Sequence, residues 1–165
     1  MNRTLLFLFP ALMVAPMSSD ITTMKIPNWI PATLIAGNLT ISYWLRLSWT
    51  DVFLNFSCGA AILILSGALF QRGWVGGGDA KLASATAVWI GWGSILDYGL
   101  AAAIFGGLLT IFILVFRTAP LPRVLAAQGW IARLHDGRNG IPYGIALAAA
   151  GLMQYPHTRI WAVSV

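Results

Sequence analysis

Long apolar runs, separated by short polar or proline-containing segments, dominate this chain. Six are distinguished: Leu5–Met17, Trp29–Leu47, Val52–Phe70, Leu82–Leu96, Tyr98–Phe116 and Ile141–Tyr155. A helix needs roughly 17–25 residues to cross a bilayer. The third and fifth runs have this length, and the other four must draw on polar flanking residues. The pattern predicts an all-α polytopic membrane protein, a bundle of about six transmembrane helices that forms one domain over residues 1–165.

Composition supports a membrane protein. Hydrophobic residues make up 58% of the chain and charged residues 9%, whereas soluble domains carry about 25% charged residues. The net charge of +5 does not require a nucleic-acid partner, because Lys and Arg in membrane proteins set topology and contact anionic head groups. The single cysteine, Cys58, excludes an intramolecular disulfide and a CxxC-type zinc site. We interpret it as a small packing residue.

Two aspartates lie where apolar runs end. We expect the first span to continue through Asp20 and the fourth to begin near Asp79. A carboxylate at the edge of a membrane span is costly and usually functional. Two crossings separate these residues, so both face the same side of the membrane. We interpret Asp51 and Asp97 as short-loop charges on the opposite face.

The basic residues predict the orientation. If Asp20 faces the cytoplasm, seven basic residues lie inside and three outside, which agrees with the positive-inside rule and places the N-terminus outside. The inner set is Lys25, Arg72, Lys81, Arg117, Arg123, Arg133 and Arg138, and the outer set is Arg3, Arg46 and Arg159. Arg3 argues locally for the reverse, because it precedes the first span. Tryptophans near the span ends fit an interfacial belt: Trp29, Trp44, Trp49, Trp74 and Trp130.

Two segments allow alternative interpretations. Residues 1–19 resemble a cleavable signal peptide, and its removal would leave Asp20 at a new N-terminus with five spans behind it. A cytoplasmic Asp20 that pairs with Asp79 argues against this. The long connection Arg117–Gly140 contains Val124–Leu134, which is either an amphipathic helix lying at the membrane interface or part of a solvated basic loop.

The residues around the two aspartates predict their presentation. Asp20 is followed by Lys25-Ile26-Pro27-Asn28, in which Pro27 turns the chain and Lys25 can reach the head groups. Asp79 follows three glycines, Gly76–Gly78, which we call the glycine ledge. Glycines permit close backbone approach and conformations barred to other residues. We expect an extended peptide to lie against this ledge.

Two facing carboxylates predict acid/base chemistry. Desolvation and like charge prevent both from staying ionised, so the pair shares a proton, as in aspartic proteases. The ionised member takes a proton from a water, which attacks the scissile carbonyl, and the protonated member donates to the carbonyl oxygen. This needs no metal and no cofactor. Signals for other chemistries are weak, because spaced metal ligands, a G-x-S-x-G elbow and a P-loop ending are missing from the sequence.

The same elements resemble a known family. Asp20 with Lys25-Ile26-Pro27-Asn28, followed by Gly76-Gly77-Gly78-Asp79-Ala80-Lys81, is similar to the type IV prepilin peptidases, membrane aspartic proteases of the G-x-G-D class. Gly140-Ile141-Pro142-Tyr143-Gly144 also resembles their C-terminal region. The resemblance implies two catalytic residues, Asp20 and Asp79. It implies supporting roles for Gly76, Gly78, Lys81, Lys25, Pro27 and Asn28.

The resemblance also implies a function. Larger members carry a cysteine-containing domain associated with N-methylation, which we expect to be absent because only about eight residues separate Asp20 from the second span. The compact form is similar to the peptidases of tight-adherence (Flp) pilus systems. The implied activity removes short basic leaders from prepilins or pseudopilins, after a glycine, on the cytoplasmic face of the bacterial inner membrane. The implied partners are the lipid bilayer and the pilus assembly machinery, with no nucleic acid.

The sequence also allows other functions. A small transporter or ion pathway would use the two aspartates as relay carboxylates, although such proteins often show an inverted repeat, and none is apparent in this sequence. A non-catalytic subunit of a pilus or secretion system would tolerate Asp→Asn at both positions. Within the protease class, an archaeal preflagellin peptidase or a presenilin-like enzyme is an alternative.

Overall fold

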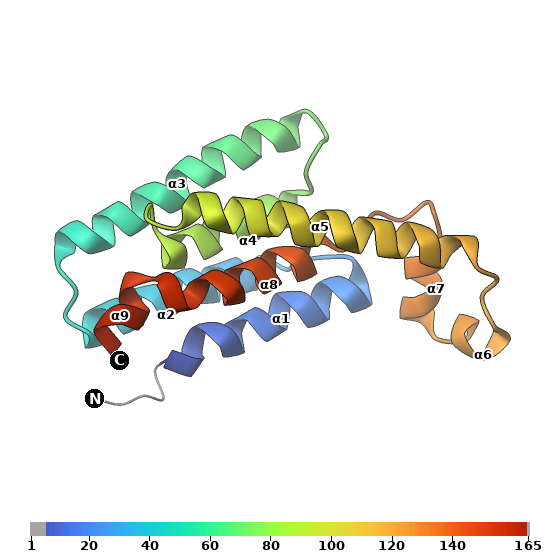
Figure 1. Cartoon of the computed structure of the whole chain (residues 1–165), viewed down its shortest axis with the longest axis horizontal. Helices are drawn as coiled ribbons and strands as arrows, with labels where there is room; N and C mark the ends of the chain where they lie inside the picture. The colour runs from blue at the N-terminus through green and yellow to red at the C-terminus, as the bar shows by residue number, and fades with distance from the viewer. Residues whose placement is uncertain (1–5, 165) are drawn as a thin grey trace.

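The computed structural model describes residues 6–164, and all of their regular secondary structure is helical (Figure 1). The helices are α1 (Leu8–Thr23), α2 (Trp29–Trp44), α3 (Trp49–Gln71), α4 (Gly77–Ile90), α5 (Ile95–Thr118), α6 (Arg123–Ala126), α7 (Gly129–His135), α8 (Tyr143–Gln154) and α9 (Arg159–Ser164), with a 3-10 turn at Tyr155–His157. The predicted all-α class is confirmed for these residues. Arg3 and the predicted start of the first run at Leu5 lie outside the described part of the chain.

The six predicted runs correspond to α1 to α5 and α8, with shifted boundaries. The fourth run was expected to reach Leu96, but α4 ends at Ile90. Gly91 stops it, because its φ of 70° lies in a region that helices do not use. Ile95 instead begins α5. The first helix runs without a break through Pro16.

Among residues 6–164, two helices, α3 and α5, are long and apolar enough to cross a membrane. Only 17% of the most apolar window of each is buried, and side chains such as Ile64 and Leu96 are 75% and 85% exposed. The core helix of a soluble protein would hide these side chains. The other predicted spans are shorter, with 16 residues in α1 and α2, 14 in α4 and 12 in α8, so six crossings are not confirmed by helix length.

Helix α4 is the centre of the fold. It packs against α2, α3, α5 and α8, and every residue from Ser84 to Ile90 is buried. Trp89 contacts the Phe9 ring of α1 at a centroid distance of 5.0 Å, and its Nε1–H donates to the Leu34 carbonyl of α2 at 2.9 Å. The core therefore holds α4 along its length and fixes the position of its N-terminus, where Asp79 lies.

The connection between α5 and α8 is partly helical. The stretch Val124–Leu134, considered as one amphipathic helix or as a solvated loop, contains two short helices instead, α6 and α7. They are separated at Ala127 and Gln128. The connection lies beside the end of α1, because the Arg133 guanidinium donates to the Thr22 carbonyl at 2.6 Å.

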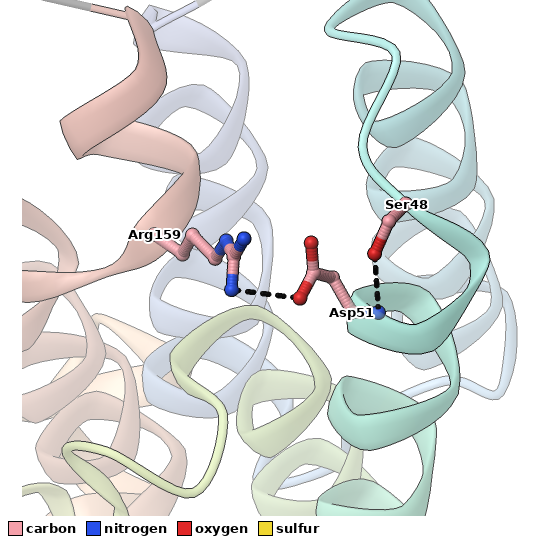
Figure 2. Close-up of polar contacts among 3 residues, drawn as sticks. All are labelled: Ser48, Asp51 and Arg159. Atoms are coloured by element: carbon pink, nitrogen blue, oxygen red, sulfur yellow. Dashed lines mark hydrogen bonds and ion pairs between the residues drawn. The ribbon is translucent and has the colours of Figure 1, made fainter.

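An ion pair joins the C-terminal segment to α3 at the opposite end of the bundle (Figure 2). Asp51 lies in the first turn of α3, where its N–H donates to the Ser48 hydroxyl at 3.2 Å. Its carboxylate, with a side chain only 10% exposed, contacts the Arg159 guanidinium at 2.7 Å. The interpretation of Asp51 as a loop charge is therefore wrong, because it binds α9, a helix that the apolar pattern did not predict. Asp97 is exposed, but it lies in the first turn of α5 and not in a loop, so its interpretation as a loop charge is also wrong.

Candidate active site

A cavity of about 1170 Å³ lies at one end of the bundle, and both aspartates line it. Four parts of the chain form its wall. They are the end of α1 with the following loop Met24–Asn28, the turn Gly73–Gly78 with Asp79, the start of α8 with Gly140, Ile141 and Tyr143, and inner residues of α3, α4, α5 and α8. The sequence prediction that Asp20 and Asp79 share one end of the molecule agrees with this arrangement. The antiparallel course of α1, α2, α3 and α4 (Figure 1) produces it, since α1 ends where α4 begins.

Asp20 is buried near the end of α1, with 5% of its surface exposed. Its Oδ2 accepts a hydrogen bond of 2.6 Å from the Gly144 N–H in the first turn of α8. Burial raises the pKa of Asp20, and the Gly144 N–H opposes this rise, because a hydrogen bond to a carboxylate favours its ionised form. The side chain is thus held from outside its own helix by a backbone donor.

Asp79 lies in the first turn of α4, outside the two candidate membrane spans, three residues after the N-cap Gly76. A carboxylate at this position can reach back to the N-cap N–H, as in a capping box. Burial and then the nearby Asp20 charge raise the pKa of Asp79 to about 7, and the hydrogen bond with the Gly76 backbone opposes them. The Asp20 charge therefore acts on Asp79, and the raised pKa allows Asp79 to hold a proton near neutral pH.

The glycine ledge is needed for space and not for unusual backbone angles. Gly76 has a φ of −68°, and the described glycines with positive φ are Gly73 and Gly91. The expectation that the ledge adopts conformations barred to other residues is therefore wrong. A Cβ on Gly76 would lie 2.6 Å from Asp79 Oδ2, and one on Gly78 would lie 3.1 Å from the Ile26 Cβ. The loop after Asp20 thus packs directly on the ledge.

The predicted supporting residues connect the two aspartate elements. Lys81 Nζ donates to the Asn28 Oδ1 at 2.8 Å, which ties α4 to the residue before α2. The Ser19 hydroxyl donates to the Lys25 carbonyl at 2.8 Å and so folds the loop back onto α1. Pro27 lines the cavity between these contacts. The Lys25 side chain is exposed at the cavity edge.

Gly144 is a site residue that the sequence reasoning did not single out. A Cβ at this position would lie 2.7 Å from Asp20 Oδ2 and 2.9 Å from the Ile26 Cδ1. A side chain at this position would therefore displace the Asp20 carboxylate or the Ile26 side chain. The only signal in the sequence was the second glycine of Gly140-Ile141-Pro142-Tyr143-Gly144, and nothing there indicates which aspartate it contacts.

Comparison with known proteins assigns the family. The family model described as "Type IV leader peptidase family" matches residues 7–111, more than half of the chain. The chain belongs to the type IV leader peptidase family. The matched region includes Asp20, Asp79 and the segments that follow or precede them, whereas Arg117 and Gly144 lie beyond it. Membership confirms the resemblance and indicates a peptidase. No curated protein and no solved structure gives a significant match.

Proposed function

We propose that this protein is a membrane-embedded aspartic endopeptidase that removes the short basic leader of prepilins on the cytoplasmic side of the bacterial inner membrane. One observation carries the proposal. The buried carboxylate of Asp20 and the half-buried carboxylate of Asp79, from different helices, line a single cavity, in a member of the type IV leader peptidase family.

The proposed reaction is hydrolysis by water. The Asp20 carboxylate, which accepts the Gly144 N–H, takes a proton from a water as the water oxygen bonds to the scissile carbonyl carbon. Asp79, whose pKa is raised to about 7, donates its proton to the carbonyl oxygen. The tetrahedral intermediate then collapses, the C–N bond breaks, and the leaving nitrogen receives the proton held by Asp20. The carboxylate of Asp79 recovers its proton from the hydroxyl of the intermediate, so the dyad returns to its starting state.

The cavity suits a peptide that combines a polar leader with an apolar segment. Its wall includes the apolar side chains of Ile26, Phe70, Ile141 and Leu147. Within the glycine ledge, Gly76 is exposed and lies beside the Asp79 carboxylate. The exposed apolar surfaces of α3 and α5 would contact lipid, so that a pilin held in the same bilayer can present the residues that follow its leader. Prepilins or pseudopilins are thus the proposed substrates, and the pilus assembly machinery is the proposed destination of the product.

Conservative removal of each carboxyl group tests the proposal. Asp20→Asn and Asp79→Asn keep the side-chain volume, so both should insert normally into the membrane and both should abolish leader removal from a co-expressed prepilin whose leader ends in glycine. Asp97→Asn is the matched control, because Asp97 is exposed in the first turn of α5. Normal processing by either dyad variant, measured by the size shift of the pilin and normalised to membrane-inserted peptidase, would show that the dyad is not catalytic. It would then favour a non-catalytic subunit.

A further inference from the structure

Arg117 makes an unusual set of contacts for a residue read from the sequence as a topological charge. It lies in the last turn of α5, and its guanidinium reaches three backbone carbonyls. Nε donates to the Leu134 carbonyl at 2.8 Å, and Nη2 donates to the carbonyls of Asn139 and Gly140 at 3.1 and 3.0 Å. A planar guanidinium can hold several acceptors in a fixed arrangement, which a lysine ammonium cannot.

These carbonyls lie on both sides of the turn that leads from α7 to α8. The Gly140 carbonyl, held by Arg117, is only four residues from Gly144, whose N–H donates to Asp20. Between them the Tyr143 N–H donates to the Ile141 carbonyl at 2.9 Å. The segment is therefore fixed at its start by α5 and reaches the carboxylate at its end.

The geometry points to Arg117 as a positioning residue for Asp20. We propose that its hydrogen bonds to the carbonyls of Asn139 and Gly140 set the path of residues 140–144, and so place the Gly144 N–H on Asp20 Oδ2. The inference deepens the proposed function and rests on it. It assigns a role in catalysis to a part of the chain beyond residues 7–111, where the family match ends.

The contact between Gly144 and Asp20 explains how a remote residue affects the reaction. One oxygen of Asp20 is held by the N–H, which fixes the rotation of the carboxylate and leaves the other oxygen to accept the proton of the attacking water. A shift of the turn would rotate this oxygen away from the water. A displacement of about 1 Å in a catalytic group can cost about 100-fold in rate, so Arg117 acts on the rate without touching the reacting atoms.

A purely structural role for Arg117 makes a different prediction. A cation in the last turn of α5 also interacts favourably with the helix dipole. If this were its only role, removal would lower the amount of folded protein and leave the turnover of the folded fraction unchanged. A measurement of kcat per folded molecule therefore distinguishes the positioning role from the purely structural role.

The first test compares Arg117→Gln with Arg138→Gln, which removes an exposed arginine of the same connection. The probe is a synthetic peptide with a short basic leader ending in glycine, followed by an apolar segment, cleaved by purified full-length protein in detergent. We expect Arg117→Gln to lower kcat about 10-fold or more, from the loss of charged hydrogen bonds, with little change in KM. Arg138→Gln should match the parent. A normal kcat for Arg117→Gln, or an equal fall for both variants, overturns the inference.

Two further variants keep the test decisive if Arg117→Gln folds poorly. Arg117→Lys retains the charge but donates as a compact point charge, so it should restore folding and only part of kcat; full restoration of kcat contradicts the proposal. Gly144→Ala places a Cβ against Asp20 and should cost about 100-fold in kcat.

Because both residues act through one hydrogen bond, combining Arg117→Lys with Gly144→Ala should lower kcat no further than Gly144→Ala alone. Multiplied losses would show independent effects and refute the mechanism.

The same assay separates this inference from the proposed function. If Asp20→Asn and Asp79→Asn cleave the peptide normally, the proposed function fails and the inference fails with it. If both are inactive while Arg117→Gln turns over normally, the peptidase assignment stands and the positioning role alone is rejected.

Discussion

At the scale of single residues, the two aspartates differ in what holds them. Asp20 receives a backbone N–H from a helix more than a hundred residues away in the sequence. Asp79 receives a backbone N–H from Gly76 at the start of its own helix, and the negative charge of Asp20 also acts on it. A donor from a separate element favours ionisation of Asp20, and the neighbouring charge disfavours ionisation of Asp79. In the proposed mechanism, this asymmetry favours Asp20 as the base and Asp79 as the acid.

The assignment predicts a pH dependence. Asp79 must be protonated to donate, and burial together with the Asp20 charge raises its pKa to about 7, so kcat/KM should fall as the pH rises through about 7. The sign for stability is the same. A carboxyl group whose pKa is raised on folding binds more protons in the folded state than in the unfolded state. The free energy of unfolding therefore falls as the pH rises through the folded pKa.

Initial rates of leader cleavage between about pH 5 and pH 9 test this dependence. Thermal unfolding over the same range should show a loss of stability in the parent that is smaller in Asp79→Asn. A rate that stays constant or rises from pH 7 to pH 9 would contradict the assignment of Asp79 as the acid.

The glycine ledge predicts an order of sensitivity to alanine. A Cβ at Gly76 meets the Asp79 carboxylate, and one at Gly78 meets the Cβ of Ile26. A Cβ at Gly77 meets only the ring edge of Phe70, at 3.2 Å, and this side chain is 53% exposed and free to shift. Gly76→Ala should therefore lose the most activity, on the order of 100-fold, Gly78→Ala less, and Gly77→Ala the least.

Cleavage assays normalised to inserted protein check this order. Gly67→Ala is a suitable control, because an added Cβ there meets no atom within 4 Å. Equal activity of the three ledge variants would remove the ledge from the mechanism and leave only the aspartates.

At the scale of elements, the apolar pattern predicted where helices form but not how they end or what joins them. Runs of apolar residues identify helices because burial or lipid contact follows side-chain type. The end of α4 depends on the backbone angle of one residue, Gly91, which composition does not encode. The α9 segment is anchored by an ion pair between Asp51 and Arg159, a contact across more than a hundred residues that no local pattern reveals.

The candidate site was predictable to a similar degree. Asp20 and Asp79 were found from the cost of a carboxylate at the edge of an apolar run. Asn28 and Lys81 were recognised as motif positions, but the hydrogen bond between them required the fold. Gly144 was missed because its role is to leave space beside Asp20, and the sequence does not show which residue approaches a glycine.

The end of α1 supplies a prediction of its own. Met24 has a φ of 56°, a left-handed conformation, and its N–H caps the Asp20 carbonyl at 2.9 Å. Met24→Gly should be at least as stable as the parent, because glycine adopts this conformation without cost. Met24→Val should be less stable than the parent, because a β-branched residue fits this conformation worse than methionine does, and it should lose activity, since the strain lies four residues from Asp20.

Arg46 provides the matched comparison for Met24. It also has a positive φ, of 51°. However, it follows the C-terminal end of α2, whereas the loop after Asp20 precedes the N-terminal end of that helix. Arg46→Val should lower the thermal midpoint without lowering the activity of the folded fraction. Equal effects of Val at positions 24 and 46 on specific activity would show that the end of α1 has no special relation to the site.

At the scale of the whole molecule, the two aspartates of the site lie on short helices, and the long helices form the exposed apolar surface. Asp20 and Asp79 lie on α1 and α4, which have 16 and 14 residues, while α3 and α5 expose most of their apolar side chains. Short helices can end inside the boundary of a bilayer, so that polar groups at their termini meet water from one side. In the proposed function, this arrangement would let the site receive both water and a membrane-held substrate.

The orientation of the molecule gives the last prediction. Arg133 contacts the Thr22 carbonyl, so the basic connection lies at the same end as Asp20. At the other end Arg159 is paired with Asp51. By the positive-inside rule the cavity end should face the cytoplasm. Cysteines at exposed Thr50 and Gln128 report the two sides, and Ser48 is left unchanged because it caps α3.

The experiment labels intact cells with a membrane-impermeant maleimide. Thr50→Cys should react before lysis, and Gln128→Cys should react only after lysis. The parent protein is the control, because its single cysteine, Cys58, is fully buried and should remain unlabelled in both conditions. Labelling of position 128 but not of position 50 in intact cells would invert the orientation. It would place the dyad on the outer face, where a leader that stays in the cytoplasm cannot reach it.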